Sequence, residues 1–267
     1  MVDSGRAPAD GEGTAHRPGR LHVGTSGWHY RHWIGPFYPP GSRPRDFLPF
    51  YVRHFRTAEI NRSFYRLPSR EAFAAWRDAT PPGFLFACKA SRFMTHMKKL
   101  KDPAEPVARL FDAIEPLGDK LGPVLFQLPP RWRADPERLA AFLAALPAGR
   151  RYAFEFRDPS WFEPRVHPVL ADHGAAVCAY ELAGFRSPIE DGTADFVYVR
   201  LHGPDGPYAG SYDDALLAGW AGRMLAWADA GKDVYCYFDT DDRGFAPHDA
   251  LRLLRLIGER GGGDDGQ

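Results

Sequence analysis

Eight short apolar runs, rich in β-branched and aromatic residues, recur along this chain and constrain its fold more than any other feature. They begin at Leu21, Thr57, Phe84, Gly122, Arg151, Ala175, Phe196 and Asp233. Each run has the length and composition of a buried β-strand. Successive runs start roughly 30 residues apart, which leaves room for a strand, a helix and their loops in each unit. The chain is therefore predicted to alternate strands with helices.

The segments between the runs carry helix signals. An apolar stripe from Leu139 to Leu146 follows Asp135, the predicted N-cap, and Pro136 in the first turn. A longer helix is expected over 211–230, and further helices over 69–79, 105–117 and 247–257. Residues 182–195 contain one proline, two glycines and no helical stripe. We therefore expect an irregular crossover between strands six and seven.

Two folds fit this alternation, a closed (β/α)8 barrel and an open, doubly wound sheet. Polar residues near the strand ends favour the barrel, in which alternate residues face the lumen and active sites form at the C-terminal ends. Glu155 and Arg157 are two residues apart, as are Arg200 and His202, so each pair faces one side. The GTSGW segment after the first run also lacks a dinucleotide-binding glycine pattern. The prediction is an α/β fold, a single (β/α)8 TIM-type barrel.

Composition limits the domain organisation and the location. We expect disordered tails over 1–20 and 259–267, which are rich in small and polar residues, and one barrel domain over 21–258. No apolar run is long enough to span a bilayer and no secretory signal is visible, so we expect a cytoplasmic protein without membrane contact. Cys88, Cys178 and Cys236 lie far apart in strand-like runs and are expected to be reduced core residues.

An ordered set of motifs extends from Leu21 to Ile257. They read GTSGW, GPFYPPG, EINRSFYRLPS, PPGFLFACKAS, LGDKLGPVLFQLPP, YAFEFRDPSWF, FVYVRLHG and YCYFDTDDRGFAPHDA. These motifs resemble the YecE-like family, also called the domain of unknown function 72 family. The resemblance implies a TIM-type barrel and no particular activity. This chain departs from the family pattern at Asp239, Thr240 and Asp249, where asparagine is usual.

Two acidic residues at opposite strands are candidates for catalysis. Glu59 and Glu155 lie in the second and fifth runs, so they could flank a substrate across the lumen and share acid and base roles. His202 is the candidate proton donor. The alternative is that these groups form a buried ion network that fixes the register of the barrel.

The predicted mouth of the barrel also carries cations, amides and aromatic rings that could bind a substrate. Lys89, Arg157 and Arg200 are expected to clamp an anion, and residues 89–101 contain five lysines or arginines and no acid. The expected substrate-binding residues are Trp28, Tyr30, Asn61, Lys89, Gln127, Arg157, Arg200, Tyr237 and Asp239. The alternatives are a solvated charged surface and aromatic loops that only cap the barrel.

A metal site is a further option, although the sequence identifies no certain cofactor. His29 and His32 are three residues apart, and His202, Glu59, Glu155 and Asp239 could complete a nitrogen and oxygen donor set for a divalent metal. The two histidines lie in a loop rich in glycine and proline, which weakens the spacing argument.

Three functions remain open on these grounds. The leading hypothesis is a hydrolase-like enzyme that acts on an anionic, phosphate-bearing substrate, with a nucleotide or a nucleic acid as candidates. The second is a glycosidase-like enzyme that uses Glu59 and Glu155 with aromatic platforms for the sugar. The third is a barrel that binds single-stranded nucleic acid without catalysis. The oligomeric state is left open.

Overall fold

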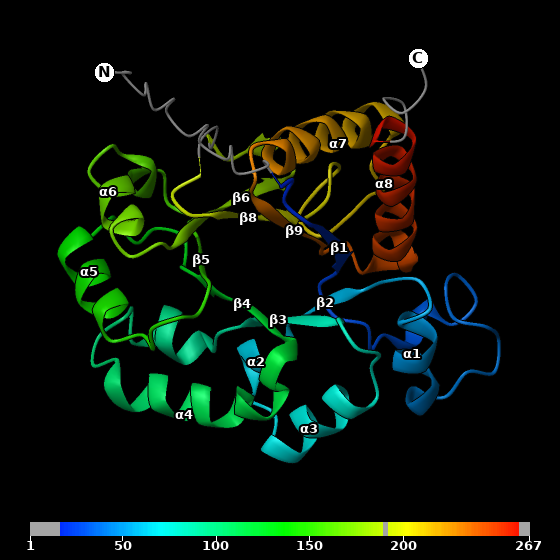
Figure 1. The fold of residues 1–267 in the computed structure, drawn as a ribbon, viewed down its shortest axis with the longest axis horizontal. Coiled ribbons are helices and arrows are strands. Elements are labelled where there is room, and N and C mark those ends of the chain that lie inside the picture. The colour runs from blue at the N-terminus through cyan, green and yellow to red at the C-terminus, as the bar shows by residue number, and fades with distance from the viewer. Residues whose placement is uncertain (1–16, 189–191, 262–267) are drawn as a thin grey trace, which may run out of the picture.

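The computed structural model describes residues 17–188 and 192–261, and every run expected to be a strand is one (Figure 1). The strands are β1 (Leu21–Thr25), β2 (Thr57–Ile60), β3 (Leu85–Lys89), β4 (Leu121–Gln127), β5 (Tyr152–Glu155), β6 (Ala176–Leu182), β8 (Phe196–Leu201) and β9 (Asp233–Phe238). They are hydrogen-bonded in the order β1-β9-β8-β6-β5-β4-β3-β2, and each of these pairs is parallel. The helices surround this ring of strands.

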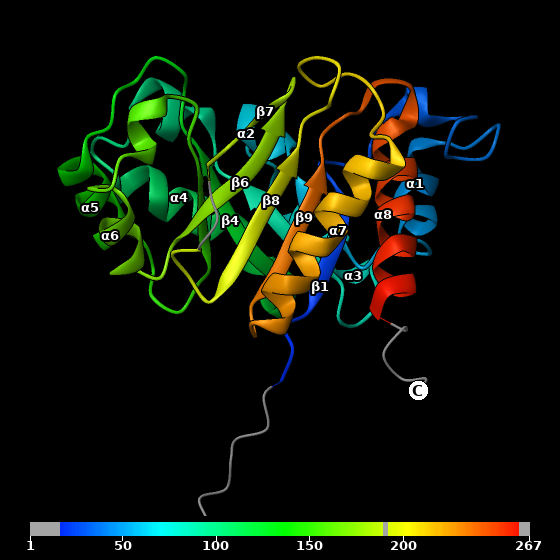
Figure 2. The same cartoon turned by 90° about the horizontal axis from the view of Figure 1, so that it is seen from above.

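The ring is nearly closed between β1 and β2. Ser26, just past β1, forms a parallel bridge with Glu59, and the Gly27 amide donates to the Glu59 carbonyl oxygen over 2.8 Å. Figure 2 shows the arrowheads of β6, β8 and β9 at the same end of the barrel. The prediction of a single (β/α)8 TIM-type barrel is therefore confirmed.

The helices lie where the sequence pattern places them, with a few additions. They are α1 (Pro44–Tyr51), α2 (Arg62–Tyr65), α3 (Arg70–Asp78), α4 (Ala104–Ile114), α5 (Pro136–Ala144), α6 (His167–Ala171), α7 (Asp214–Asp229) and α8 (Phe245–Gly261). Short 3₁₀ turns cover 31–33, 115–120, 159–162 and 242–244, and one π-helical turn covers Phe93–Met97. The Asp135 carboxylate caps α5 by accepting from the Arg138 amide over 3.1 Å. The sequence pattern did not predict the short α1, α2 and α6. Helices α2 and α6 carry too few residues for a helical stripe, and α1 has a proline, Pro49, in its interior.

The crossover between β6 and β8 is irregular, as predicted, in the residues that are described there. It contains one short strand that was not expected, β7 (Phe185–Arg186), which pairs antiparallel with the end of β6. Ser187 fixes this hairpin, because its amide donates to the Tyr180 carbonyl oxygen over 2.9 Å.

The barrel includes residues on both sides of the boundaries expected at 21 and 258. The Gly19 amide donates to the Ala228 carbonyl oxygen, and the Arg20 amide donates to the Asp233 carboxylate, each over 2.8 Å. At the other end α8 continues to Gly261. The rest of the expected tails, 1–16 and 262–267, lies outside the described residues. None of the described helices is long and apolar enough to cross a membrane.

Strand alternation divides the interior into two layers. Outward-facing residues such as Phe86, Phe126 and Val199 pack with the helices in one apolar cluster. Inward-facing residues such as Leu125 and Tyr198 form a second cluster inside the barrel. Because side chains two apart on a strand share a face, this inner cluster leads directly to the polar residues at the strand ends.

The seam between β1 and β2 leaves no room for a side chain at Gly24. A Cβ atom there would lie 2.3 Å from the Thr57 carbonyl oxygen. We expect Gly24→Ala to lower the free energy of unfolding by about 1–3 kcal/mol through overpacking, measured by urea denaturation. Gly219→Ala on α7 is the control, because a Cβ atom there meets nothing within 4 Å. Equal stability of the two variants would contradict this account of the seam.

Candidate functional site

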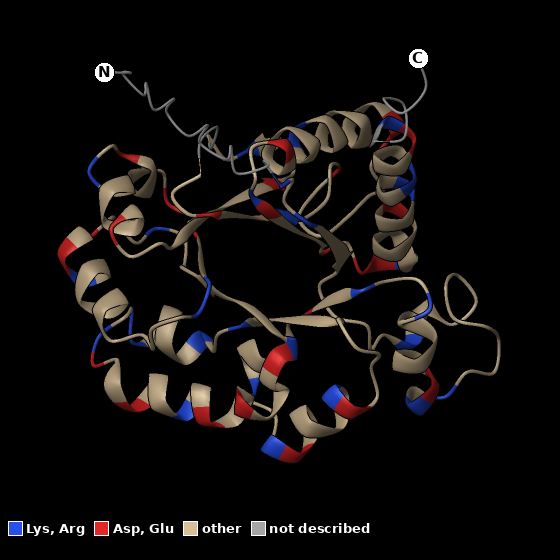
Figure 3. Cartoon of the chain, viewed as in Figure 1, with Lys and Arg blue, Asp and Glu red and all other residues tan. Residues whose placement is uncertain are grey.

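The strands bring charged side chains together at the C-terminal end of the lumen. Tyr198, Arg200 and His202 face inward from β8 and its end, and Tyr237 and Asp239 face inward from β9 and its end. Figure 3 shows charged positions on the barrel strands as well as on the outer helices. The polar pairs predicted from their two-residue spacing therefore do face the lumen.

Arg200 is the centre of this arrangement and is fully buried. Its Nε and Nη2 atoms donate to the two carboxylate oxygens of Glu59 over 3.1 and 2.8 Å. Its Nη1 donates to Glu155 Oε2 over 2.8 Å, and Nη2 also donates to Asp239 Oδ2 over 2.8 Å. Ser26 Oγ lies 3.2 Å from Nη2. The guanidinium is directed entirely at groups of this chain, so Arg200 does not have a free edge for the anion clamp expected from the sequence.

Glu59 and Glu155 lie on opposite sides of Arg200 instead of on opposite sides of an open site. Glu59 also accepts from Ser26 Oγ over 2.5 Å and from the Tyr198 hydroxyl over 2.7 Å. Burial alone would raise the pKa of Glu155, but Arg157 and Arg200 outweigh burial and hold that pKa well below its ordinary value. Glu155 is therefore an ion near neutral pH and has no proton to donate.

His202 lies between two carboxylates and an arginine. Its Nδ1 is 3.0 Å from Asp239 Oδ2, and its Nε2 is 2.9 Å from Arg157 Nη2. Arginine can only donate, so the Arg157 contact assigns the lone pair to Nε2 and the proton to Nδ1, facing Asp239. A proton on Nε2 would instead face Glu155 Oε1, 3.1 Å away. The contact with Arg157 therefore selects the tautomer that is protonated on Nδ1 in this arrangement.

Asp239 stays ionised in this position. Burial raises its pKa, but Arg200 and His202 more than compensate, and the pKa lies well below its ordinary value. The Arg157 Nε donates to Glu155 Oε1 over 2.6 Å, and the Arg157 guanidinium lies 4.8 Å from the centre of the Tyr180 ring. The site holds three cations and three carboxylates: Lys89, Arg157, Arg200, Glu59, Glu155 and Asp239.

Lys89 differs from the other charged groups of the site. It ends β3, its side chain is 4% exposed, and Nζ lies 4.3 Å from the centre of the Phe64 ring. Among the described residues, no carboxylate lies within the 4.0 Å that defines an ion pair with Nζ. Burial, and then repulsion from Arg200, lowers the pKa of Lys89 to about 8. Lys89 is therefore a cation at the mouth that lacks a direct acidic partner.

Exposure divides the predicted site residues into a floor and a rim. Arg200, Glu59, Glu155, His202 and Tyr237 are 0% exposed and form the floor. Lys89, Gln127, Asp239 and the Arg157 side chain retain 4–9% exposure and form the rim. A ligand that enters from the mouth would meet the rim first.

Sequence reasoning missed several partners of the floor. Tyr198 and Ser26 bind Glu59, and the Thr57 hydroxyl lies 2.7 Å from the Tyr237 hydroxyl one layer below. The period of two in β8 would have placed Tyr198 on the face of Arg200, which is the one available signal. Ser26 has no such signal, because its contact depends on closure between β1 and β2.

The aromatic residues expected to face a ligand line a separate cavity outside the lumen. Trp28, Tyr30 and Asn61 lie with Trp76 and Tyr65 around a volume of about 430 Å³. Trp28 packs edge to face on Trp76, with ring centres 5.3 Å apart, and the Tyr30 hydroxyl donates to the Ser26 carbonyl oxygen over 2.7 Å. The Asn61 Oδ1 atom is buried and has no hydrogen-bond partner. Tyr30 nevertheless borders the ionic site, because burial and then the charges of Asp239, Asp241 and Glu59 raise the pKa of its hydroxyl.

The histidines proposed as metal ligands point to other partners. His29 is exposed and packs on Phe47, and His32 Nε2 lies 2.6 Å from the Asp241 carbonyl oxygen. Within residues 17–188 and 192–261, no group of three or more His, Cys, Asp or Glu side chains is arranged to hold a metal ion. The metal option expected from the sequence therefore has no donor set in these ranges.

Fold and site together define an α/β-barrel protein with a buried ionic network at the end where barrel enzymes place their chemistry. The chain belongs to the family described as "Protein of unknown function DUF72", whose profile matches residues 22–265. This result confirms the resemblance to the YecE-like family.

Relatives and solved structures agree with this assignment. The UPF0759 protein YunF of Bacillus subtilis is 26% identical over 273 residues, which cover 89% of this chain and 94% of YunF. The UPF0759 protein YecE of Escherichia coli is 28% identical over 145 residues, 53% of this chain and 50% of YecE. The crystal structure of a DUF72 family protein from Thermotoga maritima has a TM-score of 0.82 and 26% identity, and covers 90% of this chain and 99% of that chain. These names state no activity, so the chemistry has to be argued from the site.

Removing Arg200 tests whether it neutralises the floor. Arg200→Met would leave three buried carboxylates without their shared cation, and we expect the free energy of unfolding at pH 7 to fall by about 3–5 kcal/mol. The difference in free energy of unfolding between the wild type and the variant should shrink as the pH falls. Protonation neutralises the unpaired carboxylates of the variant, whereas the wild type loses the stabilisation from ionised Glu155 and Asp239. Urea denaturation at several pH values measures both effects. Arg255→Met, which breaks an exposed pair with Glu259, is the control, and an equal loss there would refute the role of Arg200.

Lys89 gives a second signature, at alkaline pH. Its pKa is about 8 in the folded chain and 10.5 in its ordinary environment, so above pH 8 the unfolded chain binds more protons. The free energy of unfolding of the wild type should therefore rise relative to Lys89→Met, by about 1.4 kcal/mol between pH 7 and pH 9. Parallel stability curves for the two proteins would show that the Lys89 ammonium is not perturbed.

Proposed function

We propose that this protein is an enzyme that binds an anionic, phosphate-bearing substrate at the rim of the barrel and hydrolyses it. The observation that carries the proposal is the state of Lys89. Every other cation of the site forms an ion pair with a carboxylate of this chain, whereas Lys89 has no carboxylate within ion-pair distance among the described residues. A desolvated ammonium at a barrel mouth is stabilised when an anion binds to it.

Arg157 is the second group of the rim that supports anion binding. Its guanidinium is held on one side by Glu155 and lies over the Tyr180 ring, which fixes its plane. Arginine offers five donors in a planar fork that matches phosphate oxygens. Lys89 supplies a point charge and Arg157 a directional contact, and Gln127 adds an amide at the same rim.

His202 is the group best placed to move a proton in this proposal. Asp239 accepts the Nδ1 proton, and a substrate anion that draws the Arg157 Nη2 atom away would leave the Nε2 lone pair free to accept a proton from water. Glu59 and Glu155 contribute by holding Arg200 and Arg157 in place. This differs from the acid and base roles expected from the sequence, because both carboxylates form ion pairs with arginines of this chain.

The glycosidase-like alternative has less support. Such an enzyme needs one carboxyl group that carries a proton near neutral pH and a second carboxylate across an open space. Here the Arg200 guanidinium occupies the space between Glu59 and Glu155, and the pKa of Glu155 is lowered and not raised.

A cytoplasmic location is part of the proposal. Cys88, Cys178 and Cys236 are buried and free, and burial raises the pKa of each thiol, so the described part of the chain has no reactive pair that an oxidising compartment would bridge.

Phosphate binding tests the proposal directly. We expect inorganic phosphate to bind the wild-type protein in calorimetry at low ionic strength, and Lys89→Met to weaken that binding at least tenfold, because the variant keeps the length of the side chain without its charge. Lys232→Met is the matched control, because Lys232 precedes β9 at the opposite end of the barrel. Equal phosphate affinity of Lys89→Met and the wild type would contradict the proposal.

Turnover separates binding from catalysis. With p-nitrophenyl phosphate as the probe, His202→Asn should retain phosphate affinity and lose release of nitrophenol, because asparagine can replace the Nδ1 hydrogen bond but cannot transfer the proton. If the wild type binds phosphate but releases no nitrophenol, the binding part of the proposal stands and hydrolysis of this ester is excluded.

A further inference from the structure

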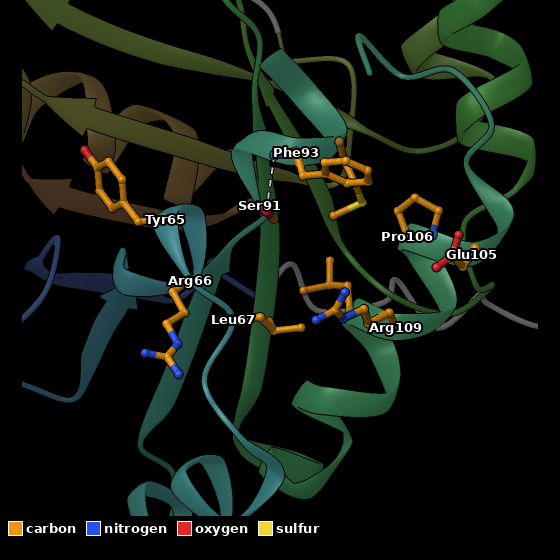
Figure 4. A pocket seen from close by; sticks show the side chains of 10 residues that line it. Tyr65, Arg66, Leu67, Ser91, Phe93, Glu105, Pro106 and Arg109 are labelled. Carbon is orange, nitrogen blue, oxygen red and sulfur yellow. Dashed lines mark hydrogen bonds between the residues drawn. The ribbon is translucent and has the colours of Figure 1, made fainter. Parts of the chain in front are cut away.

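A second surface feature lies outside the barrel, beside the mouth. A groove of about 520 Å³ opens between α2 and α4, next to the segment that follows β3 (Figure 4). Tyr65 and Arg66 line it from α2 and its end, Phe93 from the segment after β3, and Arg109 from α4. We call this feature the α2–α4 groove. None of the charged groups of the ionic site lines it.

Large apolar side chains are exposed around the α2–α4 groove. Tyr65 and Met97 are each 68% exposed, and Phe93 is 43% exposed. These three are among only five large hydrophobic residues that are exposed in the described part of the chain. Figure 4 shows the Tyr65 and Phe93 rings on two separate elements. Exposed rings that line one groove from separate elements can each stack an unpaired base of a partner.

The backbone that carries Phe93 is held in an unusual conformation. Phe93–Met97 forms a π-helical turn, and the Phe93 amide donates to Ser91 Oγ over 3.2 Å. Lys99 and Leu100 follow with φ of 47° and 64°, a region that residues other than glycine rarely adopt. Leu100 is 2% exposed, and its amide donates to the Met94 carbonyl oxygen over 2.9 Å. The ring and the adjacent cations are therefore presented by a fixed loop.

The two segments that frame the groove are strongly basic. Residues 62–66 and 89–109 together contain eight lysines or arginines and only two acidic residues, although the net charge of the chain is zero. Asp102 pairs with Lys98, and Glu105 is the one carboxylate that lines the groove. Besides Lys89, six of the cations form no ion pair with any described residue: Arg62, Arg66, Arg92, Lys99, Lys101 and Arg109.

We propose that the α2–α4 groove binds single-stranded nucleic acid. Cations without ion-pair partners fit a row of phosphates, and the exposed rings of Tyr65 and Phe93 fit unpaired bases. A duplex would hide its bases from these rings, and an acidic peptide would supply charge without flat rings to stack. This inference rests on the groove alone and does not depend on the phosphate site at the barrel mouth.

The test is fluorescence anisotropy with labelled oligothymidylate of about ten nucleotides, a length within the usual range of single-strand sites. The wild type should bind this strand more tightly than a duplex of the same length or a polyphosphate without bases. Tyr65→Ala and Phe93→Ala should each weaken binding about 5- to 100-fold, whereas Tyr65→Phe and Phe93→Tyr, which keep a ring, should retain most of the affinity.

Salt dependence tests the cations separately. Arg66→Gln and Arg109→Gln should each reduce the slope of log affinity against log salt by about 0.7, the value for one phosphate contact on a single strand. Arg53→Gln is the control, because Arg53 is exposed and lies before β2, at the opposite end of the barrel. The substituted residues Tyr65, Arg66, Phe93 and Arg109 are exposed, so the melting temperatures of the variants should match that of the wild type.

Three results would overturn the inference. The first is the absence of oligothymidylate binding at low salt. The second is equal affinity for polyphosphate or for an acidic peptide, which would reduce the groove to a charged surface. The third is unchanged affinity in Phe93→Ala and Tyr65→Ala. Equal phosphate affinity of Lys89→Met and the wild type, with oligothymidylate binding intact, would overturn the proposal for the rim and leave the groove proposal standing, so the two proposals fail independently.

Discussion

The interior of this barrel depends on one guanidinium. Arg200 is fully buried and contacts Glu59, Glu155 and Asp239, so it neutralises acidic groups from three other strands at one point. Ions in a protein interior are stable only when their partners replace the lost water, and here the partners come from opposite sides of the ring. The network consequently exists only when the barrel is nearly closed. At this end of the molecule, the buried charges are therefore neutralised only in the folded, nearly closed barrel.

Much of this architecture could be predicted from the sequence, because it follows from local periodicity. The eight apolar runs became strands, and the two-residue spacing of Arg200 and His202 correctly placed both in the lumen. What each charge would contact could not be predicted, since that depends on which strands lie opposite and on their register. Ser26 reaches Glu59 only across the closing seam. Spacing also does not contain the distances that distinguish Arg200, which is bonded to three carboxylates, from Lys89, which has no acidic partner among the described residues.

The molecule separates its charges by depth. Charged groups at the floor form ion pairs with one another, and groups at the rim are slightly exposed. The α2–α4 groove carries cations with no acidic partner in the described residues. Phe64 and Tyr65 link the last two regions, because the Phe64 ring lies under Lys89 while its neighbour Tyr65 lines the groove. A long anionic ligand could therefore contact both surfaces at once, whereas a small one would be held only at the rim. The chain's zero net charge conceals this arrangement entirely.

The pairing of β1 has a consequence for how the protein is made. Leu21 of β1 lies opposite Val234 of β9, so β1 leaves the ribosome long before the strand that covers one of its edges. Its other edge meets β2 through little more than the bridge at Ser26. Contacts between such distant residues form slowly and leave strand edges exposed in the meantime. The barrel therefore cannot close during synthesis until β9 has been made. Until then the nascent chain needs protection from aggregation.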